Sequence, residues 1–383
     1  MLKTLKIKNF TVFGDVEFTF SPGLNVIVGE NGAGKTHVLK LGYLFSRAWP
    51  DLTAQRLAVN KERAQAYLAE RLAALFQVSE LSALVRSGIK SGSGLQAEVD
   101  GHIPTVQFRL PNEPESFSPG VNERMPWKVQ IQRGKDQAGL LKAEVLPDEV
   151  PEAAARNAFL PRQILVPSKE MVSLFKGLIG LFDKYRDFPL DISYRDLAVA
   201  MSTLEPREAP PLMLDVMRGM QTLLGGNLKL EKGELVFERT DGSNLEISLM
   251  AEGYRKLAML IYLVRYGVLE QGSTLFWDEP EANLNPAALK LLAEALYALA
   301  SVGVQVIVAT HSLFLLREFE ILQMRRQQAP LPAVALNRYF GLGQKQRGGP
   351  VSVTQSFDIA DIEPLVLLDE NLLQSDRYME VSP

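Results

Sequence analysis

Residues 24–36 of this 383-residue chain are LNVIVGENGAGKT, a short apolar strand followed by a glycine-rich loop, and the apolar segment HVLKLGYLF comes next. The loop fits the pattern G-x-x-x-x-G-K-[ST], whose glycines let backbone N–H groups curl around phosphate oxygens without side-chain clashes. A strand before the loop and a helix after it are the context that such a loop requires. A chance match somewhere in a chain of this length has odds of about 1 in 100, and this context lowers them. The segment therefore predicts nucleotide binding.

The last two residues of this loop carry its charge and its metal-binding hydroxyl. Lys35 is expected to reach the β- and γ-phosphates, and Thr36 to hold Mg²⁺. The helix that starts near Lys35 adds the positive end of its dipole. The predicted phosphate-binding residues are Gly29, Asn31, Gly32, Ala33, Gly34, Lys35 and Thr36.

A second apolar strand, residues 274–277, runs directly into two carboxylates, Asp278 and Glu279. A magnesium–nucleotide site needs such groups opposite its phosphate loop, so we expect Asp278 to bind Mg²⁺ and Glu279 to polarise the attacking water. The alternative is that these are two solvated carboxylates at a strand end without a function. The phosphate loop in the same chain makes this alternative much weaker. The predicted catalytic residues are Lys35, Glu279 and His311.

His311 follows the next apolar strand, VQVIVAT. This strand comes directly after the one that carries the acidic pair, so we expect the His311 ring to approach the same γ-phosphate. The alternative is a histidine without a function. Ser312 can cap the helix that follows. Asn285 followed by Pro286 predicts another helix start. Asn283 then lies in the short connector before this helix, at the carboxyl edge of the sheet, where α/β folds bind ligands.

Composition narrows the class of protein. The net charge is −4, from 41 basic and 45 acidic residues, which gives no support to bulk attraction for nucleic acid and leaves a local basic patch open. The chain has no cysteine, which excludes disulfides and cysteine metal sites. The N-terminus lacks the apolar core of a signal peptide, and the most apolar later stretch is too short to span a bilayer and contains Arg265. We expect a cytoplasmic protein with no membrane segment.

Four segments in this order resemble the motifs of ABC-type ATPases. They are GENGAGKT, AEGYRK, LFWDEPEANLNP and VATHS, similar to the Walker A, signature, Walker B with D-loop, and switch-histidine motifs. Residues 5–36 resemble the soluble branch that includes SMC proteins, RecF and the OLD-like ATPases. The resemblance covers both ends of the chain, and residues 50–160 carry no motif of the family.

The resemblance, together with strands and helices that alternate from residue 252 onward, predicts the fold class. We expect an α/β P-loop NTPase fold: an ABC-type ATPase head with a mostly parallel central sheet, an N-terminal antiparallel β subdomain and a helical lobe. The head would be one discontinuous domain over residues 1–383. Its expected parts are a nucleotide-binding core at 1–48 and 245–383, an inserted helical and β arm at 50–160, and a helical lobe at 168–228.

The family resemblance also implies a homodimer that closes around Mg²⁺ and ATP, with each nucleotide between one subunit's loop and the other's signature segment. The implied signature residues are Ala251, Glu252, Gly253 and Arg255, and the implied D-loop residues are Asn283 and Asn285. An ordinary helix start is the alternative for the signature segment.

Three departures from the family pattern affect these roles. Ala251 stands where the signature usually has serine, so a hydroxyl contact is missing unless Ser248 replaces it. No glutamine follows the strand QILVP, which leaves Glu170 as a further candidate magnesium ligand, or Ser168 in its place. Asn285 stands where transporter-type D-loops usually have aspartate.

We therefore predict an ATP-binding and ATP-hydrolysing head that gates a DNA-associated process, either repair or defence against phage and foreign DNA. A separate nuclease or toxin subunit is the expected effector, DNA is a candidate partner, and assembly beyond the dimer stays open. Two alternatives remain: a nucleotide-switched scaffold with little turnover, which Ala251 and the missing glutamine favour, and an ABC transporter ATPase subunit, which would need a membrane partner.

Overall fold

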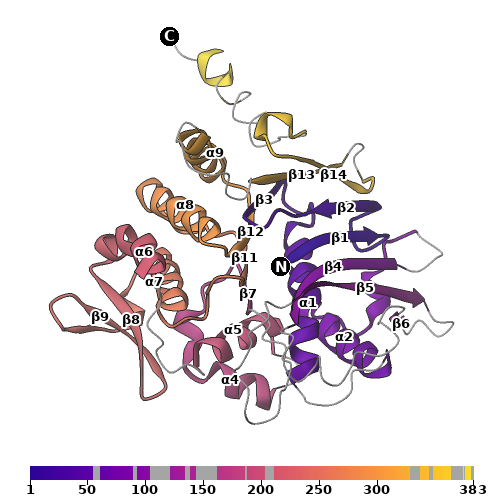
Figure 1. Cartoon of the computed structure of the whole chain (residues 1–383), viewed down its shortest axis with the longest axis horizontal. Helices are drawn as coiled ribbons and strands as arrows, with labels where there is room; N and C mark the ends of the chain where they lie inside the picture. Colours follow the sequence, from indigo (N-terminus) through magenta and orange to yellow (C-terminus); the bar gives the residue numbers. More distant parts are fainter. Residues whose placement is uncertain are drawn as a thin grey trace, which may run out of the picture. The chain divides into compact units, whose positions relative to one another are not determined.

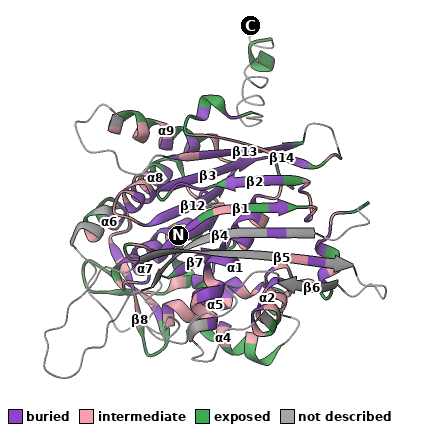
Figure 2. Cartoon of the chain, turned by 45° about the vertical axis from the view of Figure 1, so that its right-hand side comes forward, coloured by how far each residue is buried: buried purple, intermediate pink, exposed green. Residues whose placement is uncertain are grey.

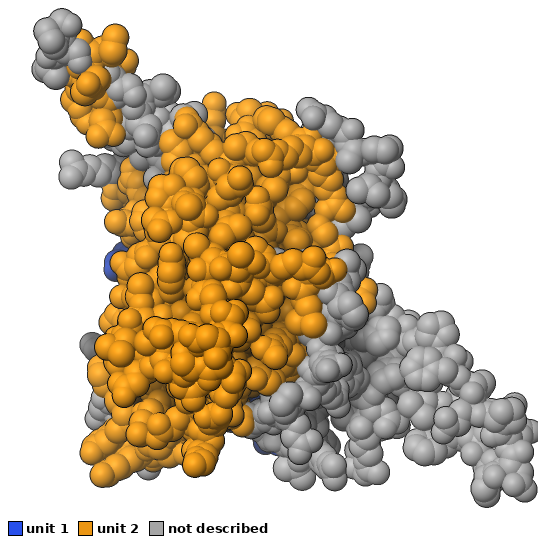
Figure 3. Space-filling model, turned by 90° about the vertical axis from the view of Figure 1, so that its left-hand side faces the viewer, with its two compact units in different colours: residues 1–20, 40–163 blue, residues 21–39, 164–383 orange. Residues whose placement is uncertain are grey.

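In the computed structural model of this chain, the described residues are 1–54, 61–88, 93–103, 121–133, 139–143, 162–185, 188–202, 211–327, 337–344, 348–363, 374 and 376–380. The chain divides into two compact units, distinguished by colour in Figure 3: residues 1–20 with 40–163, and residues 21–39 with 164–383. The domain boundaries expected from the sequence stay a prediction.

The second unit is built on a six-stranded sheet with the strand order β14-β13-β3-β12-β11-β7. Parallel pairing joins β13 to β3, β3 to β12 and β12 to β11, whereas β14 is antiparallel to β13. The strands are β3 (Leu24–Gly29), β7 (Gln163–Val166), β11 (Thr274–Asp278), β12 (Gln305–Thr310), β13 (Arg338–Gln344) and β14 (Val351–Ser356). The mostly parallel central sheet predicted from the sequence is confirmed.

The middle strands of this sheet are mostly apolar, as is typical of parallel strands that are buried on both faces. Every residue of β3, β11 and β12 is buried, as the purple ribbons of β3 and β12 in Figure 2 show. Because these strands are parallel, their carboxyl ends meet at one edge of the sheet. The loops that follow Gly29, Asp278 and Thr310 therefore start side by side.

Helices α7 (Glu252–Arg265), α8 (Pro286–Ser301) and α9 (Leu313–Gln327) lie beside this sheet in Figure 1. The predicted start of α8 is confirmed: the Asn285 side chain accepts a hydrogen bond from the Ala288 N–H at 2.9 Å, and Pro286 follows it. The Ser312 hydroxyl likewise accepts from the Leu315 N–H at 3.2 Å at the start of α9. Both caps fix where the preceding loops end.

The rest of the second unit is a group of helices and a small antiparallel sheet. The elements are η2 (Val172–Leu174), α4 (Phe175–Lys184), α5 (Ile192–Ser202), α6 (Pro211–Leu224), β8 (Gly226–Glu231), β9 (Glu234–Arg239), β10 (Asn244–Leu245), η3 (Ile247–Leu249) and η4 (Ile359–Asp361). The β8–β9 hairpin turns at Lys232 and Gly233, whose φ angles are 51° and 83°, as a two-residue turn requires.

The first unit contains a five-stranded antiparallel sheet with the order β2-β1-β4-β5-β6. Its elements are β1 (Leu2–Lys8), β2 (Asp15–Thr19), α1 (Lys35–Ala54), α2 (Lys61–Phe76), η1 (Leu81–Leu84), β4 (Ser93–Ile103), β5 (Val121–Arg133) and β6 (Gly139–Ala143), and α1 starts in the second unit. In β1 and β2, buried and solvent-facing positions largely alternate, as in a sheet with one covered face. The antiparallel N-terminal β subdomain is thus confirmed. Among the helices of the described residues, none has the length and apolarity needed to cross a membrane.

Candidate functional site

The glycine-rich loop connects β3 to α1, as predicted. Gly32 and Gly34 have φ angles of 81° and 90°, in the left-handed region that favours glycine. The Gly34 carbonyl already accepts from the Val38 N–H at 3.1 Å, so the loop leads directly into the first helical turn. Backbone N–H groups of this turn have no partner four residues earlier in the helix and can bind an anion.

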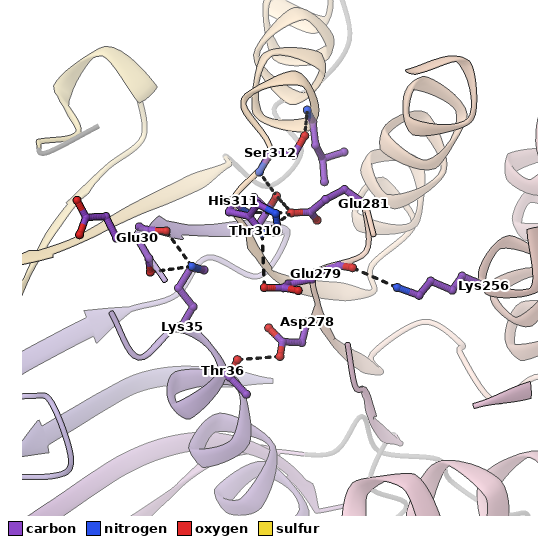
Figure 4. A network of polar contacts seen from close by, with 12 residues as sticks. Glu30, Lys35, Thr36, Lys256, Asp278, Glu279, Glu281, Thr310, His311 and Ser312 are labelled. Carbon is purple, nitrogen blue, oxygen red and sulfur yellow. Dashed lines mark hydrogen bonds and ion pairs between the residues drawn. The ribbon is translucent and has the colours of Figure 1, made fainter. Parts of the chain in front are cut away.

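Lys35 is buried, with 6% of its surface exposed, and its ammonium group lies on the loop itself. Its Nζ donates to the carbonyls of Gly29 at 2.8 Å and Glu30 at 3.0 Å, as Figure 4 shows. Burial lowers the pKa of Lys35, and the nearby carboxylates of Glu279, Asp278 and Glu281 oppose this shift. The lysine is therefore held at the site by neutral carbonyls and by the field of three acidic groups.

Thr36 and Asp278 meet across the edge of the sheet. The Thr36 hydroxyl donates to Asp278 Oδ2 at 2.8 Å, and Asp278 is 5% exposed. One hydroxyl and one carboxylate fit Mg²⁺, which is usually held by few protein ligands together with water and substrate phosphates. In the described part of the chain, no group of three or more histidine or carboxylate side chains could hold a metal without such phosphates. These two residues therefore fit Mg²⁺ that is bound together with a nucleotide.

Glu279 occupies an unusual backbone conformation. Its φ angle is 47°, in the left-handed region that non-glycine residues rarely adopt. Its N–H donates to the Ala309 carbonyl at 2.9 Å, and its carbonyl lies 3.4 Å from the Nζ of Lys256, a residue of α7 that is 2% exposed. The chain turns sharply here, immediately after β11 ends. Contacts from β12 and α7 hold this turn.

His311 lies beside Glu279, as predicted. Its Nδ1 is 3.5 Å from Glu279 Oε1 and 3.4 Å from Glu281 Oε1. The His311 side chain is 46% exposed, so its ring remains accessible to a ligand. The structure thus brings the ends of β3, β11 and β12 together in one cluster of Lys35, Thr36, Asp278, Glu279 and His311.

Glu281 belongs to the same cluster, although its sequence position alone does not distinguish it from a solvated glutamate. Its carboxylate is 7% exposed and accepts hydrogen bonds from the Thr310 hydroxyl at 2.7 Å and the His311 N–H at 2.9 Å. The signal in the sequence is weak: a second glutamate two residues after Glu279, in a segment that looks like a solvated loop. Only the tight turn at Glu279 brings it back against β12.

The predicted signature segment begins α7. Ala251 is the N-cap residue, its side chain makes no capping hydrogen bond, and α7 starts at Glu252. The exposed N-terminus of α7 therefore keeps backbone N–H groups available for an anion. Ser248 lies outside the helix, with its hydroxyl 3.4 Å from a Glu246 carboxylate oxygen. Its replacement of the missing signature hydroxyl stays a prediction.

Arg255 and Glu170 form an ion pair within the chain. Arg255 Nε lies 3.1 Å from Glu170 Oε2, and their side chains are 14% and 4% exposed. The Arg255 guanidinium also donates to the Ile247 carbonyl at 3.2 Å, and Glu170 accepts from the Ser173 hydroxyl at 2.7 Å. Both side chains thus face each other, and the roles predicted for them at a partner's nucleotide and at Mg²⁺ stay predictions.

The predicted D-loop residues lie between β11 and α8. Asn283 has a φ angle of 65°, and its backbone packs against the first turn of α7. The Asn285 side chain is the N-cap of α8. A contact of either residue across a dimer stays a prediction.

The sequence matches two protein-family profiles. Residues 162–317 match the family described as "AAA domain, putative AbiEii toxin, Type IV TA system", and residues 4–40 match the family described as "AAA domain". Among curated relatives, the DNA replication and repair protein RecF of Salinibacter ruber is 26% identical over 77% of this chain and 79% of the relative. The RecF protein of Streptococcus uberis is 44% identical over 12% of each chain.

Solved structures of SMC heads have the same fold. One, the SmcHead bound to the C-winged helix domain of ScpA, superposes with a TM-score of 0.51 at 15% identity, over 93% of this chain and 97% of that one. A second, the Smc head domain with an extended coiled coil bound to the C-terminal domain of ScpA from Pyrococcus furiosus, gives 0.51 at 13% identity, over 98% and 99%. With the phosphate loop, the acidic pair and the histidine at one sheet edge, these similarities support a P-loop ATPase of the branch that includes SMC, RecF and OLD-like proteins.

Proposed function

We propose that this chain binds Mg²⁺–ATP and hydrolyses it, and that nucleotide binding closes two copies into a dimer that gates a DNA-associated process. The observation that carries the proposal is the hydrogen bond between Thr36 and Asp278, 2.8 Å long, which joins the phosphate loop to the acidic strand end. These residues are 242 positions apart in the sequence. Their contact supports the proposal, because it brings the phosphate loop and the acidic strand end to one edge of the sheet.

The chemistry of hydrolysis follows from the roles that the cluster can supply. Lys35 can exchange its two carbonyl partners for phosphate oxygens, which are stronger acceptors because they are charged. Mg²⁺ held by Thr36 and Asp278 would neutralise charge on the β- and γ-phosphates. Glu279 would orient the attacking water, and the exposed ring of His311 would contact the γ-phosphate.

The position of α7 supports the proposed dimer. Its N-terminus lacks a side-chain cap at Ala251, and its first turn packs on the D-loop. A helix N-terminus without a cap favours an anion, so a partner's γ-phosphate would satisfy the free N–H groups. DNA as the target is supported by the two RecF relatives, which are described as DNA replication and repair proteins.

The decisive experiment combines binding and turnover on the purified full-length chain. We expect ATP to bind in a Mg²⁺-dependent manner and phosphate release to be measurable with and without duplex DNA, whereas Lys35→Met should weaken the binding and lower the phosphate release. A folded wild-type protein with no affinity for Mg²⁺–ATP would overturn the proposal. A pull-down from native cells that returned only this chain would contradict the separate effector subunit.

A scaffold that switches on ATP binding but hardly hydrolyses is the second candidate function. The observation that favours it is the ion pair between Arg255 and Glu170. This pair reduces the positive charge that α7 can offer to a partner's γ-phosphate. ATP-dependent dimerisation without phosphate release would select this candidate.

A further inference from the structure

We propose that Glu281 is the positioning residue for His311: its buried carboxylate fixes both the backbone and the ring of this histidine toward the γ-phosphate. The inference rests on the proposed ATPase function and adds to it a residue that the sequence motifs do not mark. Glu281 would act through His311 and would not touch the nucleotide.

The first support is a set of hydrogen bonds that shape the end of β12. Glu281 Oε1 accepts from both the Thr310 hydroxyl and the His311 N–H, at 2.7 and 2.9 Å. The Thr310 hydroxyl in turn accepts from the Ser312 N–H at 3.0 Å. One carboxylate oxygen therefore organises three consecutive residues where the chain leaves the sheet, as Figure 4 shows.

The second support is the orientation of the imidazole ring. His311 Nδ1 faces the carboxylates of Glu281 and Glu279, at 3.4 and 3.5 Å. A carboxylate only accepts hydrogen bonds, so a neutral ring in this position carries its proton on Nδ1. Nε2 is then on the side of the ring that faces a ligand. When the ring is protonated, Nε2 can donate a hydrogen bond to a phosphate oxygen. Such carboxylate–histidine pairs fix the tautomer and the ring direction in metal sites by the same physical effect.

The third support is the burial of a charge that stability alone does not require. A carboxylate that is 7% exposed carries a desolvation cost, and a neutral side chain could accept the same backbone hydrogen bond. The charge is balanced by Lys35 and Lys256, both buried, whose ammonium groups feel the field of Glu281. The two lysines belong to the phosphate loop and to α7, so Glu281 lies in the field of the groups proposed to handle the nucleotide.

Steady-state kinetics test the catalytic consequence. We expect Glu281→Ala to lower kcat by about 10- to 100-fold, the usual effect of removing a residue that orients a functional group. KM for ATP should change by less than about 3-fold, since Glu281 makes no contact with the nucleotide. Glu281→Gln keeps the shape and one acceptor oxygen but loses the charge, so it should recover only part of the loss, and it serves as the variant that folds if Ala does not.

A double-mutant cycle tests whether Glu281 acts through His311. The variant that combines Glu281→Ala with His311→Ala should have the same kcat as His311→Ala alone, because a residue that acts only through His311 has nothing left to position. Additive losses would overturn the proposal, as would a wild-type kcat in Glu281→Ala.

Histidine ¹⁵N NMR on the nucleotide-free protein gives a readout that does not depend on activity. The chain has three histidines, so the resonances of His311 can be assigned with His37→Gln and His102→Gln variants. At a pH where His311 is neutral, we expect the Nδ1–H tautomer in wild type and a shift toward Nε2–H in Glu281→Ala. An unchanged tautomer would overturn the proposal. A wild type that binds ATP without turnover would contradict the ATPase function, and the NMR experiment would still decide the role of Glu281.

Discussion

Gly253, in the first turn of α7, lies directly against the backbone of Asn283 in the D-loop. A Cβ atom at position 253 would come within 2.3 Å of the Asn283 carbonyl oxygen and 2.7 Å of Leu284 Cδ2. Only glycine allows this approach, because real Cβ atoms do not come so close to backbone atoms. The predicted signature turn and the predicted D-loop are thus packed as one unit.

Gly253→Ala should displace the D-loop from α7. The obstructing atom is a backbone oxygen, which cannot rotate away, so we expect a loss of about 1–3 kcal/mol in the free energy of unfolding, typical of overpacking. ATP-dependent dimerisation should weaken as well. Chemical denaturation and size-exclusion chromatography with Mg²⁺–ATP measure the two effects.

Gly180→Ala is the matched control for this substitution. Gly180 lies in α4, and a Cβ there would meet no heavy atom within 4 Å. Since alanine is the better helix former by about 1 kcal/mol, this variant should be as stable as wild type or more so. Equal stability losses in both alanine variants would mean that the Gly253–Asn283 contact has no special effect.

Lys35→Met should remove most of the affinity for ATP. Hydrogen bonds to charged groups contribute about 1.5–3 kcal/mol each, which corresponds to about 10- to 100-fold in the dissociation constant. The methionine side chain fills a similar volume, so the fold should persist. Isothermal titration with Mg²⁺–ATP gives the constant, and near-wild-type affinity would show that Lys35 does not contact the phosphates.

Asp278→Asn should remove the magnesium dependence of ATP binding. Asparagine can still accept the hydrogen bond from Thr36, but it lacks the charge that holds the cation. The gain in ATP affinity on adding Mg²⁺ should fall by about 10-fold or more, since even outer-sphere changes cost that much at metal sites. Titrations in Mg²⁺ and in EDTA measure this ratio, and an unchanged ratio would exclude Asp278 as a ligand.

Glu279→Gln should trap an ATP-bound dimer. Loss of a group that orients or deprotonates the attacking water typically lowers the rate by about 10²- to 10⁴-fold, while binding is retained. Gln keeps the side-chain size at a position whose φ of 47° already constrains the backbone. Size exclusion with Mg²⁺–ATP should show the dimer; a variant that stays monomeric would contradict the proposed closure of two copies.

Lys256→Met should change how stability depends on pH. Burial lowers the pKa of Lys256 below its usual 10.5, against the opposing fields of Glu252, Glu281, Glu279 and Glu170. Between the lowered folded value and 10.5, the unfolded chain binds more protons than the folded chain, so this lysine makes stability rise with pH in that window. Across the window, the free energy of unfolding rises by about 1.4 kcal/mol for each step of one in pH.

The measurement is urea denaturation of wild type and Lys256→Met from pH 7 to 10.5, the usual pKa of lysine. The difference in unfolding free energy between the two proteins should move in favour of wild type as the pH rises. A difference that is constant over this range would mean that Lys256 titrates normally in the folded state.

The sequence by itself determined the strand–loop–helix at residues 24–36, the acidic end of β11, the caps of α8 and α9 and the turn at Lys232–Gly233. Each of these depends on a few neighbouring residues: glycines that accept a positive φ, an apolar run followed by charge, or an asparagine before a proline. The parallel order of the strands then followed from the alternation of strands and helices.

Only the tertiary structure decided which polar side chains meet. Glu281 looks in the sequence like one more solvated glutamate, and Arg255 like a free cation, yet the first is buried against Thr310 and His311 and the second pairs with Glu170. These contacts join residues that are far apart in the sequence, and their partners depend on how the sheet edge and α7 pack. Local propensity carries no information on such pairings, because burial and charge compensation arise only when distant segments exclude water from the same place.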